Sequence, residues 1–211
     1  MNNINNETGR SMIEMLGVLA IIGVLSVGGI AGYSKAMMQY KINKTVDQIT
    51  QVVGNARTLY GSQKSYKGIQ TIDVWKKSHL IPDEMWNTAK TAAENPFGGG
   101  FAVDPALKKN ETNPDYKAFA IYLSGIPEDA CMAIATYDWG SGSSSGLIAI
   151  SVNDGTTGII TGYPIGCTGS STTGKAVACP NGSSVSVPMP VNIAATACAT
   201  GDSNVMLLKF Y

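Results

Sequence analysis

The stretch that decides the fold is ETGRSMIEMLGVLAIIGVLSVGGIAGYSKAM, which runs from Glu7 to Met37. Within it, residues 15–34 include no charged side chain. About 20 apolar residues in a helix are enough to cross the hydrocarbon core of a bilayer, so this section is predicted to span a membrane. Glu14 stands at the edge of the apolar run, although burying an ionised acid is unfavourable unless a partner neutralises it.

The helix is predicted to continue beyond the apolar section. A secretory signal peptide would have a shorter apolar region of about 7–15 residues, followed by a cleavage site. Here, apolar residues recur mostly at spacings of three and four from Met37 to Tyr60, among polar side chains, which indicates an amphipathic helix. The first proline is Pro82. One helix from about Ser11 to Tyr60 is therefore expected, roughly 75 Å long at 1.5 Å per residue.

Glycines interrupt the apolar half of this helix. Gly28 and Gly32 form a GxxxG pair, which is either the ordinary glycine content of a membrane helix or a site of close helix–helix packing. Glycine also lowers helix propensity by up to about 1 kcal/mol per residue. A local loss of helix near Gly28 and Gly29 is thus an open alternative once packing compensates for it.

The composition excludes some classes of protein. The chain has 211 residues, enough for one or two domains. Charged residues make up 14%, against the roughly 25% usual for soluble domains. The formal net charge is +0, without the basic excess of a nucleic-acid-binding protein. No specific nucleic-acid partner is expected.

The cysteines indicate an oxidising compartment. All four follow the apolar segment and none lies in a CxxC pair: Cys131, Cys167, Cys179 and Cys198. A zinc site is not expected in a chain with 1 histidine, because His and Cys ligands usually come in spaced pairs. Two disulfides are favoured over free thiols. Four cysteines allow three connectivities, and the sequence alone does not choose among them.

The rest of the chain is predicted to be α+β. Residues 61–114 form a connecting region with short helical turns, the second opened by Pro82. Beyond it, the patterns predict a strand, a helix, a β-hairpin, a second helix and a final strand, over residues 117–123, 127–137, 146–162, 190–199 and 204–211. Pro127 is expected at the first position of its helix, and Asp154-Gly155 is expected at the hairpin turn.

No catalytic set is present, so no enzyme activity, cofactor or metal is expected. There is no P-loop, HExxH, GxSxG or dinucleotide fingerprint. His79 has no evident catalytic partner in the sequence, and VNDGTTG (152–158) lacks the spaced carboxylates of a strong calcium site. Trp75, Trp86 and Trp139 are interpreted as packing or subunit-contact residues, with sugar binding open only if they cluster on the surface.

The position of Glu14 suggests proteolytic processing. A helix N-terminus offers free backbone N–H groups, and a new chain terminus there would add a positive charge. Cleavage after Gly9 would start the mature chain at Arg10 and make Glu14 its fifth residue. This arrangement, in GRSMIEMLGVLAIIGVLS, resembles the type III signal of type IV pilins and pseudopilins. The resemblance implies cleavage between Gly9 and Arg10, and an assembly role for Glu14.

The resemblance extends over most of the chain. NPFGGGFAV, KAFAIYLSGIPEDAC and CATGDSNVMLLKF look like the type IVb pilins, particularly the thin-pilus pilins of conjugative plasmids. This implies a leader (1–9), a long N-terminal helix (10–61) and a globular head (62–211), with the helix packed on an antiparallel sheet. It also implies a disulfide between Cys131 and Cys198, which leaves Cys167 and Cys179 as a local pair.

The function implied by this resemblance is that of a major pilin of a type IVb pilus. The precursor would sit in the inner membrane, where prepilin peptidase cleaves it, methylation modifies Arg10 and the pilus assembly machinery acts. Copies would then form an extracellular filament by packing their helices, and its surface would serve adhesion, aggregation or mating contact. The alternatives are a tip minor pilin or adhesin, a pseudopilin of a type II secretion system and, least favoured, a signal-anchored periplasmic enzyme.

Overall fold

The structure, a computed structural model, describes residues 7–106, 116–140, 146–154, 170–172, 175–178 and 185–211. Its first element is α1 (Glu7–Tyr60), a helix of 54 residues that is continuous through Gly28 and Gly29. The long N-terminal helix predicted from the sequence is thus confirmed, with a start four residues before Ser11. The chain forms two compact units, Met1–Tyr40 and Lys41–Tyr211, which are described separately.

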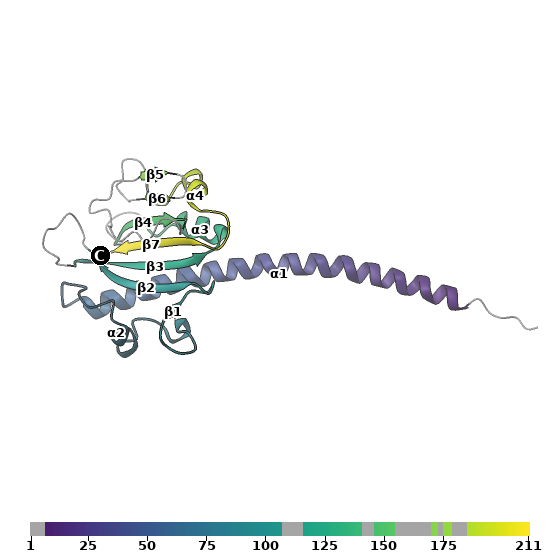
Figure 1. Cartoon of the computed structure of the whole chain (residues 1–211), viewed down its shortest axis with the longest axis horizontal. Coiled ribbons are helices and arrows are strands. Elements are labelled where there is room, and N and C mark those ends of the chain that lie inside the picture. The colour runs from purple at the N-terminus through teal and green to yellow at the C-terminus, as the bar shows by residue number, and fades with distance from the viewer. Residues whose placement is uncertain (1–6, 107–115, 141–145, 155–169, 173–174, 179–184) are drawn as a thin grey trace, which may run out of the picture. The chain divides into compact units, whose positions relative to one another are not determined.

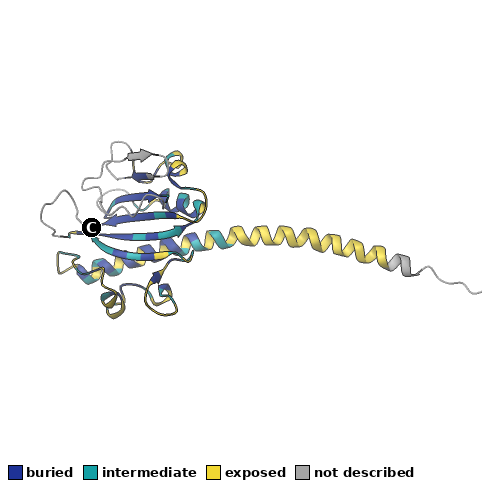
Figure 2. Ribbon diagram, in the orientation of Figure 1, coloured by how far each residue is buried: buried dark blue, intermediate teal, exposed yellow. Residues whose placement is uncertain are grey.

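The first unit contains the apolar part of α1. Every described side chain from Met12 to Ala36 is exposed (Figure 2). No charged residue lies between Glu14 and Lys35, so this part of the helix has no polar stripe that distinguishes one face, in contrast to the periodic pattern that begins at Met37.

The second unit begins with the amphipathic end of α1. Its buried apolar side chains follow the predicted spacing of three and four: Ile42, Val46, Ile49, Val52, Val53, Ala56 and Tyr60. Asp47 and Thr50, which fall between them, are exposed. This apolar stripe therefore faces the core of the second unit.

The sheet has seven strands, and all adjacent strands are antiparallel (Figure 1). The order is β1-β2-β3-β7-β4-β6-β5, so the last strand along the chain lies in the middle. The strands are β1 (Ala93–Glu94), β2 (Gly100–Ala106), β3 (Ala118–Ile126), β4 (Leu147–Asn153), β5 (Ser170–Thr172), β6 (Lys175–Ala178) and β7 (Asn204–Phe210).

Short helices flank the sheet. The connecting region contains α2 (Ile72–Lys77) and the 3-10 turn η1 (Asp83–Met85), with Pro82 at the cap of η1 as expected. Two further helices are α3 (Glu128–Ala135) and α4 (Val191–Ala197). In Figure 1, α2 lies toward the β1 edge of the sheet and α4 toward the β5–β6 edge.

The two faces of the sheet carry different sets of side chains. On the face toward α1, which we call the inner face, the Phe210 ring lies beneath the Arg57 guanidinium at 5.9 Å. Phe119 stacks on Phe210 at 5.8 Å, and Tyr66 lies 4.7 Å from Phe119. Because side chains alternate along a strand, the opposite, outer face takes residues such as Ala120 and Leu207, which belong to a separate apolar cluster.

Three sequence predictions about local structure are wrong. Pro127 caps α3 one residue before the helix begins, with an extended ψ of 153°. Tyr137 lies beyond the end of α3 and is exposed. The two edges of β4 are occupied by β6 and β7, so β4 does not form the expected hairpin with the next segment, and residues 156–162 lie outside the described residues.

The tryptophans do not form one surface cluster. Trp75 is buried and its indole N–H donates to the Ile69 carbonyl. The Trp86 ring lies 6.3 Å from the Trp75 ring. Trp139 is beyond α3, 4.9 Å from the Tyr137 ring. Packing between neighbouring segments therefore accounts for these residues, and the condition for the sugar-binding alternative is not met.

Candidate assembly site

The candidate assembly site is the exposed apolar surface of α1. Its large side chains between Met12 and Tyr33 are 52–76% exposed. By length and composition, α1 is the one helix in the described part of the chain that could cross a membrane. Roughly 25 cal/mol is gained per Å² of apolar surface removed from water. Such a surface therefore requires a lipid or protein partner.

Gly28 and Gly32 lie on this exposed part of α1. A Cβ atom placed on either residue would meet no heavy atom within 4 Å. Nothing in the described part of a single copy therefore requires glycine at these two positions. A role for the GxxxG pair in packing against another helix stays a prediction.

Glu14 occupies the exposed N-terminal end of the apolar surface. It follows Arg10 by four residues, a little more than one helical turn. Gly9 and Arg10 lie within α1 as well. In an ideal helix, the N–H groups of residues 11–13 bond to the carbonyls of residues 7–9. Removing residues 1–9 would leave these donors unpaired one turn before Glu14.

The disulfide region holds α3 and α4 together. Cys131 of α3 is bonded to Cys198, the C-terminal cap of α4, across a sequence separation of 67. The Met189 N–H also donates to the Ala135 carbonyl at 3.2 Å. Cys131 and Cys198 are thus paired as the resemblance implied, whereas Cys167 and Cys179 lie outside the described residues.

A buried amide fixes the chain after this disulfide. The Asn204 side chain, which is 0% exposed, donates to the carbonyls of Ile126 at 3.1 Å and Ala199 at 2.9 Å. Its Oδ1 accepts from the Ala199 N–H at 2.7 Å. One side chain therefore joins the end of β3 to the start of β7. The sequence gives little indication of this role, because Asn204 sits in a polar turn sequence, GDSN.

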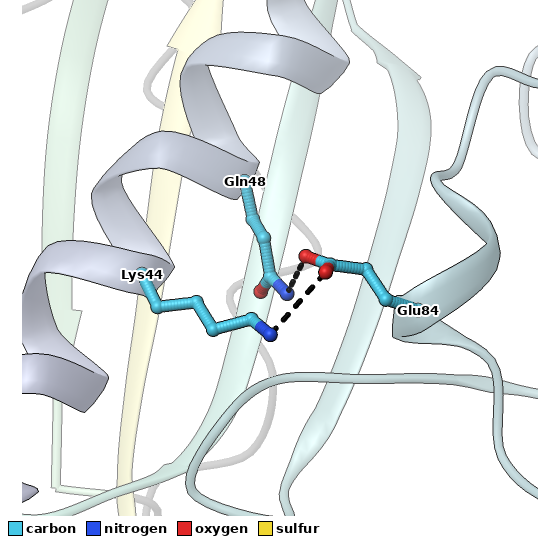
Figure 3. A network of polar contacts seen from close by, with 3 residues as sticks. All are labelled: Lys44, Gln48 and Glu84. Carbon is cyan, nitrogen blue, oxygen red and sulfur yellow. Dashed lines mark hydrogen bonds and ion pairs between the residues drawn. The ribbon is translucent and has the colours of Figure 1, made fainter.

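A polar cluster ties the connecting region to α1 (Figure 3). Gln48 Nε2 donates to Glu84 Oε1 at 3.1 Å, and Lys44 Nζ lies 3.3 Å from Glu84 Oε2. The hydrogen bond from Gln48 and, after it, the contact with Lys44 lower the pKa of Glu84 below its ordinary value of 4.5. The Glu84 side chain is 52% exposed, so solvent weakens this ion pair. Sequence reasoning missed the cluster, since only the fold brings Glu84 beside the helix.

The described residues offer no evident metal site. They contain no group of three or more His, Cys, Asp or Glu side chains that could hold a metal ion. His79 has a positive φ of 51°, and its carbonyl accepts a hydrogen bond from Asn55 at 3.2 Å. Its observed contact is therefore a backbone contact between the connecting region and α1.

Comparisons with known proteins agree with a long apolar helix joined to an antiparallel sheet. A sequence profile of the bundlin family matches residues 35–188. Two relatives, from Escherichia coli O127:H6 (strain E2348/69 / EPEC) and Escherichia coli O111:H-, are each named major structural subunit of bundle-forming pilus. Each is 30% identical over 151 residues, which cover 71% of this chain and 74% of the relative.

The fold is also found in a solved pilin structure. The crystal structure of TcpA, a type IV pilin from Vibrio cholerae El Tor biotype, matches with a TM-score of 0.52 at 15% identity. The match covers 82% of this chain and 99% of that chain. With the long helix, the antiparallel sheet and the family profile in agreement, the chain belongs to the bundlin family of type IVb pilins.

Proposed function

We propose that the chain is the major structural subunit of a type IVb pilus. The observation that carries this proposal is the exposed apolar surface of α1 between Met12 and Tyr33, in a chain of the bundlin family. A helix that is apolar on all sides suits both a bilayer and the core of a helical assembly. Transfer from lipid to a filament core replaces one apolar environment with another.

Processing would prepare the subunit for this transfer. Prepilin peptidase is expected to cut between Gly9 and Arg10, and Arg10 is expected to become N-methylated. The new terminus would supply a positive charge and unpaired N–H donors. In the filament, the amino group at Arg10 of one copy would neutralise Glu14 of its neighbour, because a carboxylate in an apolar core needs a partner.

Helix packing would hold the filament together. Gly28 and Gly32 would let the helices of adjacent copies approach closely. The precursor would sit in the inner membrane, where the pilus assembly machinery extracts it, and the assembled filament would be extracellular. Adhesion, aggregation or mating contact would follow from the exposed head. The resemblance to thin-pilus pilins of conjugative plasmids stays a prediction.

The test is the composition of sheared surface filaments. We expect this chain to be their main component, with a mature N-terminus at Arg10 detected by intact-mass measurement. A low copy number in the filaments would instead favour a tip minor pilin. A processed chain without any filament would favour a pseudopilin. A mass that does not change when prepilin peptidase is removed would refute the processing step.

A further inference from the structure

The outer face of the sheet carries a groove that the proposed function does not use. Its volume is about 480 Å³, and it lies over β1, β2, β3 and β7. The small residues Ala93, Gly100 and Ala102 leave the space open. The larger side chains of Tyr122 and Val205 form its sides.

The turn between β1 and β2 fixes one end of the groove. Asn95 Nδ2 donates to the Ser124 carbonyl at 2.8 Å, and the Phe97 N–H donates to Asn95 Oδ1 at 2.9 Å. A Cβ atom on Gly99 would lie 1.8 Å from the Ser124 oxygen, so the backbone at Gly99 comes too close to β3 for any side chain. The groove is therefore preformed by ordered strands and a tight turn.

A carboxylate lies in this apolar groove. Asp104 lines it, and burial raises the pKa of Asp104 above its ordinary value. Among the described residues, no hydrogen bond or ion pair reaches this carboxylate. A half-buried acid without a partner is unfavourable, and a cation placed beside it would recover the lost solvation. The groove thus suits a cation that carries an apolar stem.

Lysine has this shape, since its methylene stem can lie along apolar surface while its ammonium reaches a charge. Nine of the chain's 15 Lys and Arg residues fall between residues 35 and 90. Within the second unit, several of them already have partners: Lys41 lies over Phe97, Lys44 contacts Glu84, Arg57 lies over Phe210 and Lys76 lies over Trp86.

Lys64 and Lys67 are exposed, and within the described residues neither side chain makes a hydrogen bond, an ion pair or a ring contact. They flank Tyr66, whose N–H donates to the Tyr116 carbonyl at 2.8 Å, just before β3 begins. The groove extends along the outer face of β3 as far as Ser124, near the other end of the strand.

Asp104 pairs with Ala120, the third residue of β3, so the carboxylate lies toward the end of the strand that is near the Lys64–Lys67 turn. The Tyr66 ring contacts Phe119 on the inner face of the sheet, whereas the groove is on the outer face. A copy placed against the outer face would present its turn to the groove of the next copy. Such a contact uses two different surfaces and repeats without closing, as a filament requires.

We propose that the groove of one copy receives a lysine side chain from the Lys64–Lys67 turn of a neighbouring copy, whose ammonium group pairs with Asp104. This inference rests on the proposed function, because it concerns the assembled filament. It adds a head-to-head contact that is separate from the packing of the apolar helices.

The test is zero-length crosslinking of sheared filaments with a carbodiimide, followed by digestion and mass spectrometry. The expected product joins Asp104 of one copy to Lys64 or Lys67 of another, with mixed isotope-labelled subunits used to establish that the link is intermolecular. The variant Asp104→Asn should lose this product. The control Glu94→Gln, on the neighbouring strand β1 and exposed, should retain it.

Two kinds of result would overturn the inference. The first is a filament built of this chain in which other carboxylate side chains form crosslinks but Asp104 forms none. The second is a crosslink from Asp104 to Lys90, Lys108 or Lys109 of the same copy. Filaments without this chain would instead refute the proposed function, so the two failures are distinguishable. Thermal unfolding of the detergent-solubilised Asp104→Asn subunit would show whether a lost crosslink reflects a lost fold.

Discussion

Removing the disulfide between Cys131 and Cys198 should markedly destabilise the head. The bond closes a loop with a sequence separation of 67. In the chain-entropy model, this closure stabilises the fold by about 4 kcal/mol relative to the reduced chain. A domain with an ordinary free energy of unfolding, about 5–15 kcal/mol, would lose a large part of it. Both sulfurs are buried, so alanine is the appropriate replacement because it introduces no new polar group.

The assay is urea unfolding of the full chain in detergent micelles, followed by near-ultraviolet circular dichroism. The double variant Cys131→Ala/Cys198→Ala should unfold at a lower urea midpoint. The matched control is Cys167→Ala/Cys179→Ala. If that pair is bonded, its shorter loop should contribute about 1.5 kcal/mol less in the same model. A loss below about 1 kcal/mol for the first variant would refute the loop-closure reasoning, as would a larger loss for the control.

Three further predictions concern single side chains. Asn204→Ala should cost about 2–4 kcal/mol in unfolding free energy, because it leaves buried backbone groups unpaired; an unchanged urea midpoint would contradict this. Glu84 has a lowered pKa in the fold, so its contribution is present above the unfolded pKa and lost as pH falls through the folded pKa. Glu84→Gln should therefore cost less than about 1 kcal/mol at pH 7, and this cost should shrink as the pH is lowered through the folded pKa, measured as paired unfolding curves across a pH series; a deficit that does not shrink with falling pH would refute the electrostatic reasoning. Glu14→Ala should leave membrane insertion intact but abolish or slow assembly, measured by membrane fractionation and filament yield against the exposed control Asp47→Ala; normal piliation would refute the neutralisation argument.

The long helix could be predicted from the sequence because its signals are local. Uncharged residues from Met15 to Ser34 and the spacing of apolar residues from Met37 to Tyr60 each depend on neighbours along one helix. The strand at residues 117–123 and the final strand were predictable for the same reason, since each shows a run of apolar and β-favouring residues.

The hairpin after β4 was predicted wrongly because strand pairing is not local. Asp154-Gly155 has the composition of a tight turn, but β4 pairs with β7, which begins 51 residues after β4 ends, and with β6. Turn-forming residues indicate where the chain bends, but they do not indicate which strand pairs with the one before the bend. The Gln48–Glu84 contact and the groove around Asp104 were unpredictable for a related reason, since each joins segments whose proximity is set by the whole sheet.

The central position of β7 has a consequence for the order of folding. Residues 204–210 separate β3 from β4, and Asn204 contacts Ile126 across 78 residues of chain. Until these residues have been synthesised, the sheet consists of two halves with unpaired inner edges. Long-range pairing of this kind is slow and exposes the edges to other chains. A translation product that stops before Asn204 would lack the strand that joins the halves, so completion of the sheet distinguishes finished subunits from truncated ones.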